Sequence, residues 1–393
     1  MIDDKLGIDG EVVDGFEPVL DTFRDNFLNR DLAVRETGAS VAIYVEGERV
    51  VNLWGGIADA ETNTPWTEDT LGLVFSTTKG IAAICVAMLV EGGTLSYDEP
   101  VATYWPEFGA NGKAEITLGQ MLSHQAGLIF ADPPLTREQL IAVDPVVETL
   151  AAQAPLWEPG TAHGYHALTY GWLVGEVVRR ADGRRISQFL ADEVAQPLGL
   201  EMWIGLPEEF EPRVSMLLPA PRPEGEELEL MMKIAGPGTN GGRALFMDGA
   251  LGIAEGKMTF NDRDVHATEM PAANGITNAA SLARLYAATV GEVDGTRLTT
   301  STTVDAMRAE RVQGPDLSLV LPTRFGAGFM LNDTFLPFYS DSSFGHYGAG
   351  GSLGFADSDA NIGFGYIMNQ MGGGIAGDPR AVRLFESLRT CLA

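Results

Sequence analysis

The alternation of apolar and polar residues divides the chain into β-rich ends and a helical middle. Residues 38–56 carry two apolar runs around the turn Glu46-Gly47-Glu48, a pattern that predicts a β-hairpin. Residues 71–93 change at Ser76 from a short strand-like run into an apolar helix that ends at Gly92-Gly93. Ser76 is therefore predicted to stand where a strand gives way to a helix.

Residues from about 95 to 275 fall into a helical part followed by an irregular part. Helical periodicity, interrupted by Pro and Gly, dominates up to about residue 205. Residues 206–275 are rich in Pro, Gly, Met and acidic side chains, which predicts long irregular excursions over the surface. A further helix is predicted at 278–290. The predicted helices of the first part are TLGQMLSH, TREQLIAVDPVVETLAAQ, HALTYGWLVGEVVRR and SQFLADEVAQPLG.

The C-terminal part again predicts β-structure. RFGAGFML, GSLGFAD and ANIGFGYIMN are Gly-rich strand candidates, and a last helix is expected to begin near Asp378-Pro379. The sheet should be mostly antiparallel, because it opens with a hairpin and closes with consecutive strands. We predict an α/β (α+β) fold in which residues 1–95 and 275–393 form one discontinuous domain. Residues 96–274 would form an inserted, mainly helical domain with a long irregular segment at 206–274.

The charge balance narrows the choice of partners. The 393 residues have a composition typical of a soluble globular protein, with a formal net charge of -28. This charge opposes binding to nucleic acid and to anionic membrane surfaces. The apolar run 80–90 is shorter than the roughly 20 residues that cross a bilayer. The first residues, MIDDK, lack the features of a secretory signal, so we expect a cytoplasmic protein. The oligomeric state is not predicted.

Cysteine and histidine usage gives little support to metal chemistry. Two cysteines occur, Cys85 and Cys391, and the five histidines lack H-E-x-x-H spacing. His163 and His166 are interpreted as the lining of a pocket, and His124 is assigned a structural role at the end of a helix. We therefore expect neither a metal nor a cofactor.

Two serines compete for the role of nucleophile. Ser352 lies in GHYGAGGSLG, residues 345–354, which contains the G-x-S-x-G pattern of α/β-hydrolases. That pattern requires a strand before the serine and a helix after it, whereas residues 353–357 predict a strand. Ser352 is therefore interpreted as part of a Gly-rich strand.

Ser76 opens the sequence Ser-Thr-Thr-Lys, an S-x-x-K pattern. On a helix this spacing brings Ser76 and Lys79 within hydrogen-bond reach. Apolar neighbours such as Val74 and Phe75 favour a neutral lysine that can take the serine proton. The backbone N–H of Ser76 would serve as one oxyanion donor. The alternative for Ser76 is an N-cap hydroxyl, the role assigned to Ser301 in an S-T-T sequence without the lysine.

These residues and four further blocks resemble the serine β-lactamase and penicillin-binding-protein superfamily, specifically the class C-like carboxylesterases called family VIII esterases. The resemblance runs over nearly the whole chain. It implies a β-lactamase-like fold with the active site between the two domains, and an acyl-enzyme formed on Ser76. The matching blocks are VFSTTKG, TLGQMLSHQAGL, WEPGTAHGYHALTYGWLVGE, NGITNAASLARLY and FGHYGAGGSLGFAD.

The resemblance assigns a role to Tyr165 in acid–base catalysis. Tyr165 matches the tyrosine of the family that shuttles a proton from the serine to the leaving group, and Lys79 would keep it partly ionised. Without the resemblance, the preferred interpretation of Tyr165 is an aromatic residue that begins an amphipathic helix with Leu168 and Trp172. The catalytic residues implied are thus Ser76, Lys79 and Tyr165.

The resemblance also assigns roles near the C-terminus. His346-Tyr347-Gly348 stand where β-lactamases carry K-T-G, and the backbone N–H of Ala349 would be the second oxyanion donor. His346, Tyr347, Gly348 and Ala167 are predicted to contact substrate. For His346 two interpretations stay open: a group that orients substrate or Tyr165, and a structural strand histidine.

Two departures from the lactamase pattern bear on the substrate. Ala167 replaces an asparagine that helps hold the side chain of a β-lactam, and His346 replaces a lysine that recognises a carboxylate. Both changes favour a neutral ester, so the expected function is a serine carboxylesterase for short- to medium-chain acyl esters. The alternatives are a β-lactamase, a D-amino acid amidase or peptidase, an acyltransferase of the same superfamily, and a non-catalytic relative that binds a ligand.

Overall fold

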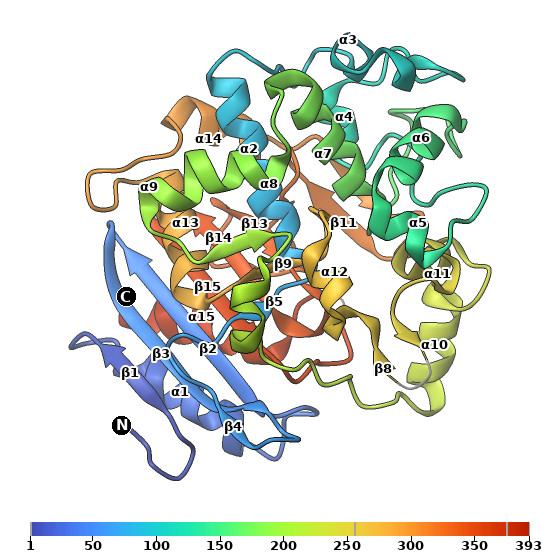
Figure 1. Ribbon diagram of the computed structural model, residues 1–393. Helices are drawn as coiled ribbons and strands as arrows, with labels where there is room; N and C mark the ends of the chain where they lie inside the picture. Colours follow the sequence, from blue (N-terminus) through green and yellow to red (C-terminus); the bar gives the residue numbers. More distant parts are fainter. Residues whose placement is uncertain (1, 255–256, 375, 393) are drawn as a thin grey trace.

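A large antiparallel sheet is the centre of the computed structural model, which describes residues 2–254, 257–374 and 376–392 (Figure 1). The strand order is β1-β3-β2-β15-β14-β13-β12-β11-β10, and β4 pairs with β3 beside this path. Every described pair in the sheet is antiparallel. The strands are β1 (Asp9–Val12), β2 (Gly38–Val45), β3 (Glu48–Asp59), β4 (Thr64–Pro65), β10 (Val312–Pro315), β11 (Pro322–Phe325), β12 (Met330–Leu331), β13 (Ser343–Tyr347), β14 (Leu353–Asp357) and β15 (Ile362–Met368).

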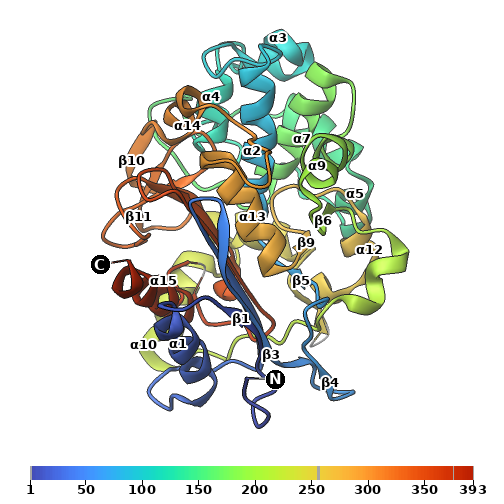
Figure 2. The same ribbon diagram turned by 90° about the vertical axis from the view of Figure 1, so that its left-hand side faces the viewer.

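Helices cover both faces of the sheet. On one face α1 (Glu17–Leu28) and α15 (Pro379–Cys391) lie side by side, and on the other face lie α13 (Ala279–Val290) and α2 (Thr77–Glu91) (Figure 2). Alternate residues of β15 serve the two cores, because side chains alternate along a strand. Phe364 and Tyr366 belong to the core under α1 and α15, whereas Ile367 belongs to the core around α2 and α13.

Helix α2 carries the serine of the S-x-x-K pattern at its start. Its sequence TTKGIAAICVAMLVE is apolar on all sides, as expected of a helix buried all round. The helix lies between the sheet and the helical part of the molecule and contacts both β13 and α7 (Thr169–Asp182). The predicted strand before Ser76 is only β5 (Gly72–Leu73). It forms the edge of a three-stranded sheet with β9 (Gly275–Thr277) and β6 (Met202–Ile204).

The two ends of the chain meet in the large sheet. The hairpin of β2 and β3 pairs with β15, which follows it by about three hundred residues. The predicted antiparallel sheet flanked by helices is thus confirmed. The division into a discontinuous domain and an inserted domain stays a prediction.

The helices predicted between residues 95 and 205 are present, with one additional break. Val143, with φ of 67°, separates α5 from α6. Pro145 suits only the first turn of a helix, so a new helix begins there. The helices of this part are α3 (Val101–Tyr104), α4 (Leu118–Leu122), α5 (Arg137–Ala142), α6 (Asp144–Ala152), α7, α8 (Ile186–Phe189) and α9 (Gln196–Leu198).

The segment predicted to be irregular, 206–274, is helical in part. It contains α10 (Gly225–Ala235), α11 (Asn240–Phe246) and α12 (Arg263–Ala267), with β7 (Ile253–Ala254) and β8 (Lys257–Met258). These elements are short and follow Pro- or Gly-rich sequence, which hides their periodicity. The N-cap expected at Ser301 is instead Thr300, one residue before α14 (Ser301–Arg308). Within the described residues, no helix has the length and apolar character needed to cross a membrane.

Candidate active site

The backbone changes direction sharply just before Ser76. Phe75 has φ of 43°, a conformation that is uncommon for a bulky residue and that clusters at functional sites. Its buried ring packs against Phe260 at a centroid distance of 4.9 Å. Ser76 itself makes no capping hydrogen bond through its side chain in the described helix α2. Its hydroxyl is therefore free of the structural role that a serine at this place usually has.

Lys79 lies fully buried one turn after Ser76. Its Nζ is 3.0 Å from Ser76 Oγ, and it donates hydrogen bonds to the carbonyl oxygens of Ala167 at 2.6 Å and of Ala272 at 2.9 Å. Burial lowers the pKa of Lys79 well below its ordinary value. A neutral amine has two N–H bonds and one lone pair. With both N–H bonds directed at carbonyls, the lone pair faces the Ser76 hydroxyl.

Tyr165 lies on the loop that precedes α7. Its backbone N–H donates to Asp316 Oδ1 at 3.0 Å, and the same oxygen accepts from the N–H groups of Ser318 and Leu319 at 2.8 Å each. The buried carboxylate therefore joins the Tyr165 loop to the segment before β11. The side chain of Tyr165 is 3% exposed, with its hydroxyl hydrogen-bonded to Ser76.

The electrostatics of Tyr165 differ from the expectation of a partly ionised phenol. Burial raises the pKa of Tyr165 well above its ordinary value, Asp316 raises it further, and only the hydrogen bond with Ser76 acts in the opposite direction. The ring lies 4.8 Å from Lys79 Nζ, but a neutral lysine does not stabilise a phenolate. Burial therefore favours the neutral form of both groups.

Three histidines surround Tyr165 without forming a metal site. His124 packs against the Tyr165 ring at 4.9 Å, and its Nδ1 accepts from the N–H of His166 at 3.2 Å. His166 accepts from the N–H of Leu128 at 3.1 Å, and His163 bonds to Thr323 at 2.8 Å. Within the described ranges no group of three or more potential metal ligands is found. These histidines hold loops together rather than line the cavity.

The second proposed oxyanion donor lies opposite the start of α2. Ala349 begins a short 3-10 turn after β13, and Ser76 precedes the first residue of α2, so both N–H groups stand where a helix offers no internal acceptor. Ser352 joins the two segments. Its Oγ donates to Val74 O at 2.8 Å and lies 3.1 Å from Thr77 Oγ1, and its carbonyl accepts from the N–H of Gly348 at 2.7 Å. Ser352 is fully buried and acts as a connection.

The predicted substrate contacts fall into different surroundings. His346 is buried beside Tyr165, with 6.0 Å between ring centroids, and burial lowers its pKa to about 3, so it is neutral. The Tyr347 side chain points to the opposite core, where its hydroxyl donates to Pro337 O. A Cβ on Gly348 would stand 2.1 Å from Ser352 Oγ, so only glycine fits. Ala167 contributes its carbonyl to Lys79.

An apolar cavity of about 160 Å³ opens at Ser76. The large apolar side chains of Leu321 and Phe335, which are 43% and 61% exposed, lie at its mouth. None of the described lining residues has a charged side chain. These residues are Ser76, Tyr165, Leu245, Leu319, Leu321, Pro322, Thr323, Met330, Phe335, Leu336, Ala349 and Ala376.

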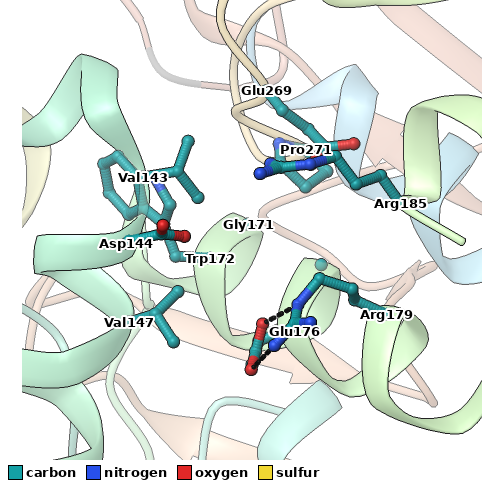
Figure 3. A pocket seen from close by; sticks show the side chains of 11 residues that line it. Val143, Asp144, Val147, Gly171, Trp172, Glu176, Arg179, Arg185, Glu269 and Pro271 are labelled. Atoms are coloured by element: carbon teal, nitrogen blue, oxygen red, sulfur yellow. Dashed lines mark hydrogen bonds and ion pairs between the residues drawn. The ribbon is translucent and has the colours of Figure 1, made fainter. Parts of the chain in front are cut away.

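Two groups that shape the site were missed from the sequence, Asp316 and the carbonyl of Ala272. Figure 3 shows Arg185 beside Glu269 and Pro271, shortly before Ala272 in the sequence. Arg185 pairs with Glu269 at 3.2 Å, and a Cβ on Gly171 would come within 2.7 Å of Ala272 N. The depression beside these residues measures about 10 Å³, room for about one water molecule. A backbone carbonyl leaves no signal in a sequence, whereas Asp316 in the run QGPDLS is a turn residue without a distinguishing motif.

Comparisons with known proteins agree with this geometry. The family model "Beta-lactamase" matches residues 24–387. The protein named esterase/beta-lactamase LipL of Mycobacterium tuberculosis is 34% identical over 343 residues, which cover 85% of this chain and 77% of LipL.

Solved structures give the same result. A family VIII carboxylesterase is 40% identical with a TM-score of 0.85, covering 98% of this chain and 99% of its own. EstA from Arthrobacter nitroguajacolicus Rue61a is 33% identical with a TM-score of 0.85, covering 98% of each chain. The predicted β-lactamase-like fold is confirmed. The chain therefore belongs to the beta-lactamase family of serine hydrolases, as the resemblance predicted.

Proposed function

We propose that this serine hydrolase is a carboxylesterase that hydrolyses neutral esters through an acyl-enzyme on Ser76. The observation that carries the proposal is the Lys79 amine, held by two carbonyls and 3.0 Å from the Ser76 hydroxyl. A base in direct contact with a serine is the arrangement that activates the hydroxyl as a nucleophile. Relatives named as carboxylesterases or esterases support the choice of an ester as substrate.

Acylation uses Ser76, Lys79 and Tyr165 in turn. Ser76 Oγ bonds to the ester carbonyl carbon while its proton passes to Lys79 Nζ, and the N–H groups of Ser76 and Ala349 bind the oxyanion. When the bond to the alcohol oxygen breaks, that oxygen takes the proton of the Tyr165 hydroxyl. The phenolate regains a proton from the Lys79 ammonium. The step ends with an acyl-enzyme, a free alcohol, and neutral Lys79 and Tyr165.

Deacylation repeats the same steps with water as the nucleophile. A water molecule attacks the acyl carbon and gives its proton to Lys79, which is neutral again after acylation. The bond to Ser76 Oγ then breaks, and this oxygen receives the proton of Tyr165. Lys79 returns a proton to Tyr165, and the carboxylic acid leaves. Because the resting groups are all neutral, each cycle ends in the protonation state in which it began.

The neutral cavity supports an ester rather than a carboxylate-bearing β-lactam. Among the described lining residues no side chain is charged, and His346, at the place of the lactamase lysine, has its pKa lowered to about 3. Burying a substrate carboxylate without a partner would cost several kcal/mol. The test compares p-nitrophenyl butyrate, nitrocefin and D-amino acid amides, together with mass spectrometry after a fluorophosphonate probe. Faster turnover of nitrocefin or amides than of esters, or no adduct on Ser76, would contradict the proposal.

The pH dependence should report the protonation of Lys79. Only the neutral amine accepts the serine proton, so kcat/KM for p-nitrophenyl butyrate is expected to rise with pH as Lys79 loses its proton. Because burial lowers the pKa of Lys79, this limb should lie well below the ordinary lysine value of about 10.4. The buried His166 and His346, with pKa values of about 3, stay neutral near neutral pH. A rising limb near pH 10, after correction for spontaneous hydrolysis, would be inconsistent with this mechanism.

The mouth of the cavity should select for longer acyl chains. Leu321 and Phe335 line the cavity and are partly exposed, so an acyl chain that outgrows the cavity would cover them. Phe335→Ala is expected to lower kcat/KM for p-nitrophenyl octanoate by about tenfold, which corresponds to about two buried CH₂ groups. The acetate, too short to reach the mouth, should change little.

The matched control for this prediction is Val320→Ala. Val320 precedes Leu321 and is 64% exposed, but it is not part of the cavity lining. Its replacement should leave the ratio of octanoate to acetate turnover unchanged. An equal loss for octanoate and acetate in Phe335→Ala would show that the mouth does not bind the acyl chain.

A further inference from the structure

The side chain of Arg380, at the start of α15, is buried with all its donors in use. Its Nε and Nη2 donate to the two oxygens of Asp378 at 2.9 and 2.8 Å, and its Nη1 donates to Glu36 at 3.1 Å. The remaining two hydrogen bonds go to carbonyl oxygens, those of Gln370 and Gly350, at 2.9 Å each. These five bonds match the five N–H groups of a guanidinium. The side chain is 1% exposed.

The Gly350 carbonyl belongs to the turn that carries the second oxyanion donor. Gly350 follows Ala349, and its carbonyl accepts from Arg380 and from the N–H of Gly372 at 2.8 Å. Its own N–H donates to Gly374 O at 3.0 Å. Arg380 also holds the carbonyl of Gln370, so it fixes the turn and the loop after β15 against each other. These hydrogen bonds therefore restrict the rotation of the peptide groups on the C-terminal side of Ala349.

The N-terminal side of Ala349 is fixed independently. The carbonyl of Gly348, which shares a peptide plane with the Ala349 N–H, accepts from the N–H of Gly351 at 3.1 Å. A planar peptide sets the direction of its N–H once its carbonyl is held. The direction of the Ala349 N–H thus depends on the conformation of residues 348–351. Arg380 holds this conformation through its hydrogen bond to the carbonyl of Gly350.

We propose that Arg380 is a positioning residue that aims the Ala349 N–H at the ester oxyanion. This inference rests on the proposed function, because it assumes an oxyanion formed at Ser76. The guanidinium never touches the substrate: it is buried between the turn and α15, with Glu36 and Asp378 as its charge partners. Glu36 is in turn held by the hydroxyl of Tyr366. A lysine has the same charge but cannot reach four partners at once with one nitrogen.

The test is Arg380→Lys. It measures how strongly the site stabilises the oxyanion, through kcat and through the preference for an oxygen ester over its sulfur analogue. A misaimed donor weakens the transition state more than the bound substrate, so kcat for ethyl butyrate is expected to fall about a hundredfold with little change in KM. The second substrate is O-ethyl thionobutyrate, whose sulfur accepts hydrogen bonds poorly. The wild-type preference for the oxygen ester should narrow by about tenfold in Arg380→Lys. The rates of both reactions are measured from the protons that hydrolysis releases.

Arg383→Lys is the matched control on the same helix. Arg383 pairs with Asp25 and Asn26 of α1 and does not contact the turn. It should change stability toward urea but leave kcat and the preference for oxygen over sulfur unchanged. If Arg380→Lys does not fold, Asp378→Asn replaces it, because an asparagine still caps α15 but holds the guanidinium through only one acceptor oxygen. Asp378→Asn is then expected to show a smaller fall in kcat and a smaller loss of the preference for the oxygen ester.

The outcomes separate this inference from the proposed function. Wild-type protein without ester turnover or a Ser76 adduct would remove the proposed function itself. Active wild-type protein in which Arg380→Lys, or Asp378→Asn in its place, keeps both kcat and the wild-type preference for the oxygen ester would overturn the inference alone. A loss confined to stability, equal to that of Arg383→Lys, would show that Arg380 holds the fold and has no part in the reaction.

Discussion

Replacement of Ser76 by alanine is expected to abolish ester hydrolysis, with a fall in kcat on the order of 10⁵-fold or more, as in other hydrolases that lose a nucleophilic serine. The hydroxyl lies at the cavity and contacts both Lys79 and Tyr165. An alanine leaves those two groups without an oxygen to activate. Turnover of p-nitrophenyl butyrate measures the loss, and a fluorophosphonate probe should no longer add its mass to the protein.

Ser352→Ala is the control for this experiment. Ser352 is buried and bonds to Val74 O and to Thr77, so its loss should lower the free energy of unfolding by about 1 kcal/mol. It should keep most of the hydrolysis and the full adduct on Ser76. If instead Ser352→Ala loses the adduct while Ser76→Ala keeps it, the G-x-S-x-G serine is the nucleophile and the assignment is wrong.

Lys79→Ala and Tyr165→Phe are each expected to lower kcat by several orders of magnitude, and the double variant should lose little more than the worse single one. Residues that move one proton in a chain act as a unit, so their losses do not add. The structure supports such a unit, because both groups contact the Ser76 hydroxyl and Nζ lies over the Tyr165 ring. Pre-steady-state release of p-nitrophenol measures the acylation step directly.

Additive losses would separate the two roles. If the free-energy costs of Lys79→Ala and Tyr165→Phe sum in the double variant, the two side chains act in independent steps. A nearly active Tyr165→Phe would remove the tyrosine from the proton path. In that case the alcohol would leave with a proton from Lys79 alone.

Local features of the fold could be predicted from the sequence. The hairpin of β2 and β3, the buried helix α2 and the last helix α15 follow from short-range patterns of apolar residues, turn residues and caps. The break at Val143 and the helices α10 and α11 were not predicted, because a positive φ and short helices in Pro- and Gly-rich sequence leave weak signals. The neighbours of each strand in the sheet depend on contacts between distant segments, which no local pattern specifies.

The residues of the candidate site, too, could be predicted from the sequence only in part. Ser76 and Lys79 could be paired from their spacing alone, because three residues on a helix fix their distance. Tyr165 could be placed only through the resemblance, since it lies on a loop whose position depends on Asp316. The carbonyl of Ala272 and the guanidinium of Arg380 belong to residues far from Ser76 in the sequence. The sequence around Ser76 therefore gives no indication of them. The expected ionisation of Tyr165 considered only its proximity to Lys79, whereas burial raises the pKa of Tyr165 and lowers that of Lys79.

The pairing of β2 with β15 has a consequence for synthesis on the ribosome. The edge of β2 that receives β15 has no partner until the last part of the chain has emerged, and an unpaired edge invites association with other chains. Ser76, the proposed nucleophile, is likewise made long before Ala349, whose N–H is the proposed second oxyanion donor. Nascent chains stalled before residue 349 should therefore be inactive and dependent on chaperones, and hydrolysis should begin only when translation has passed the final strands.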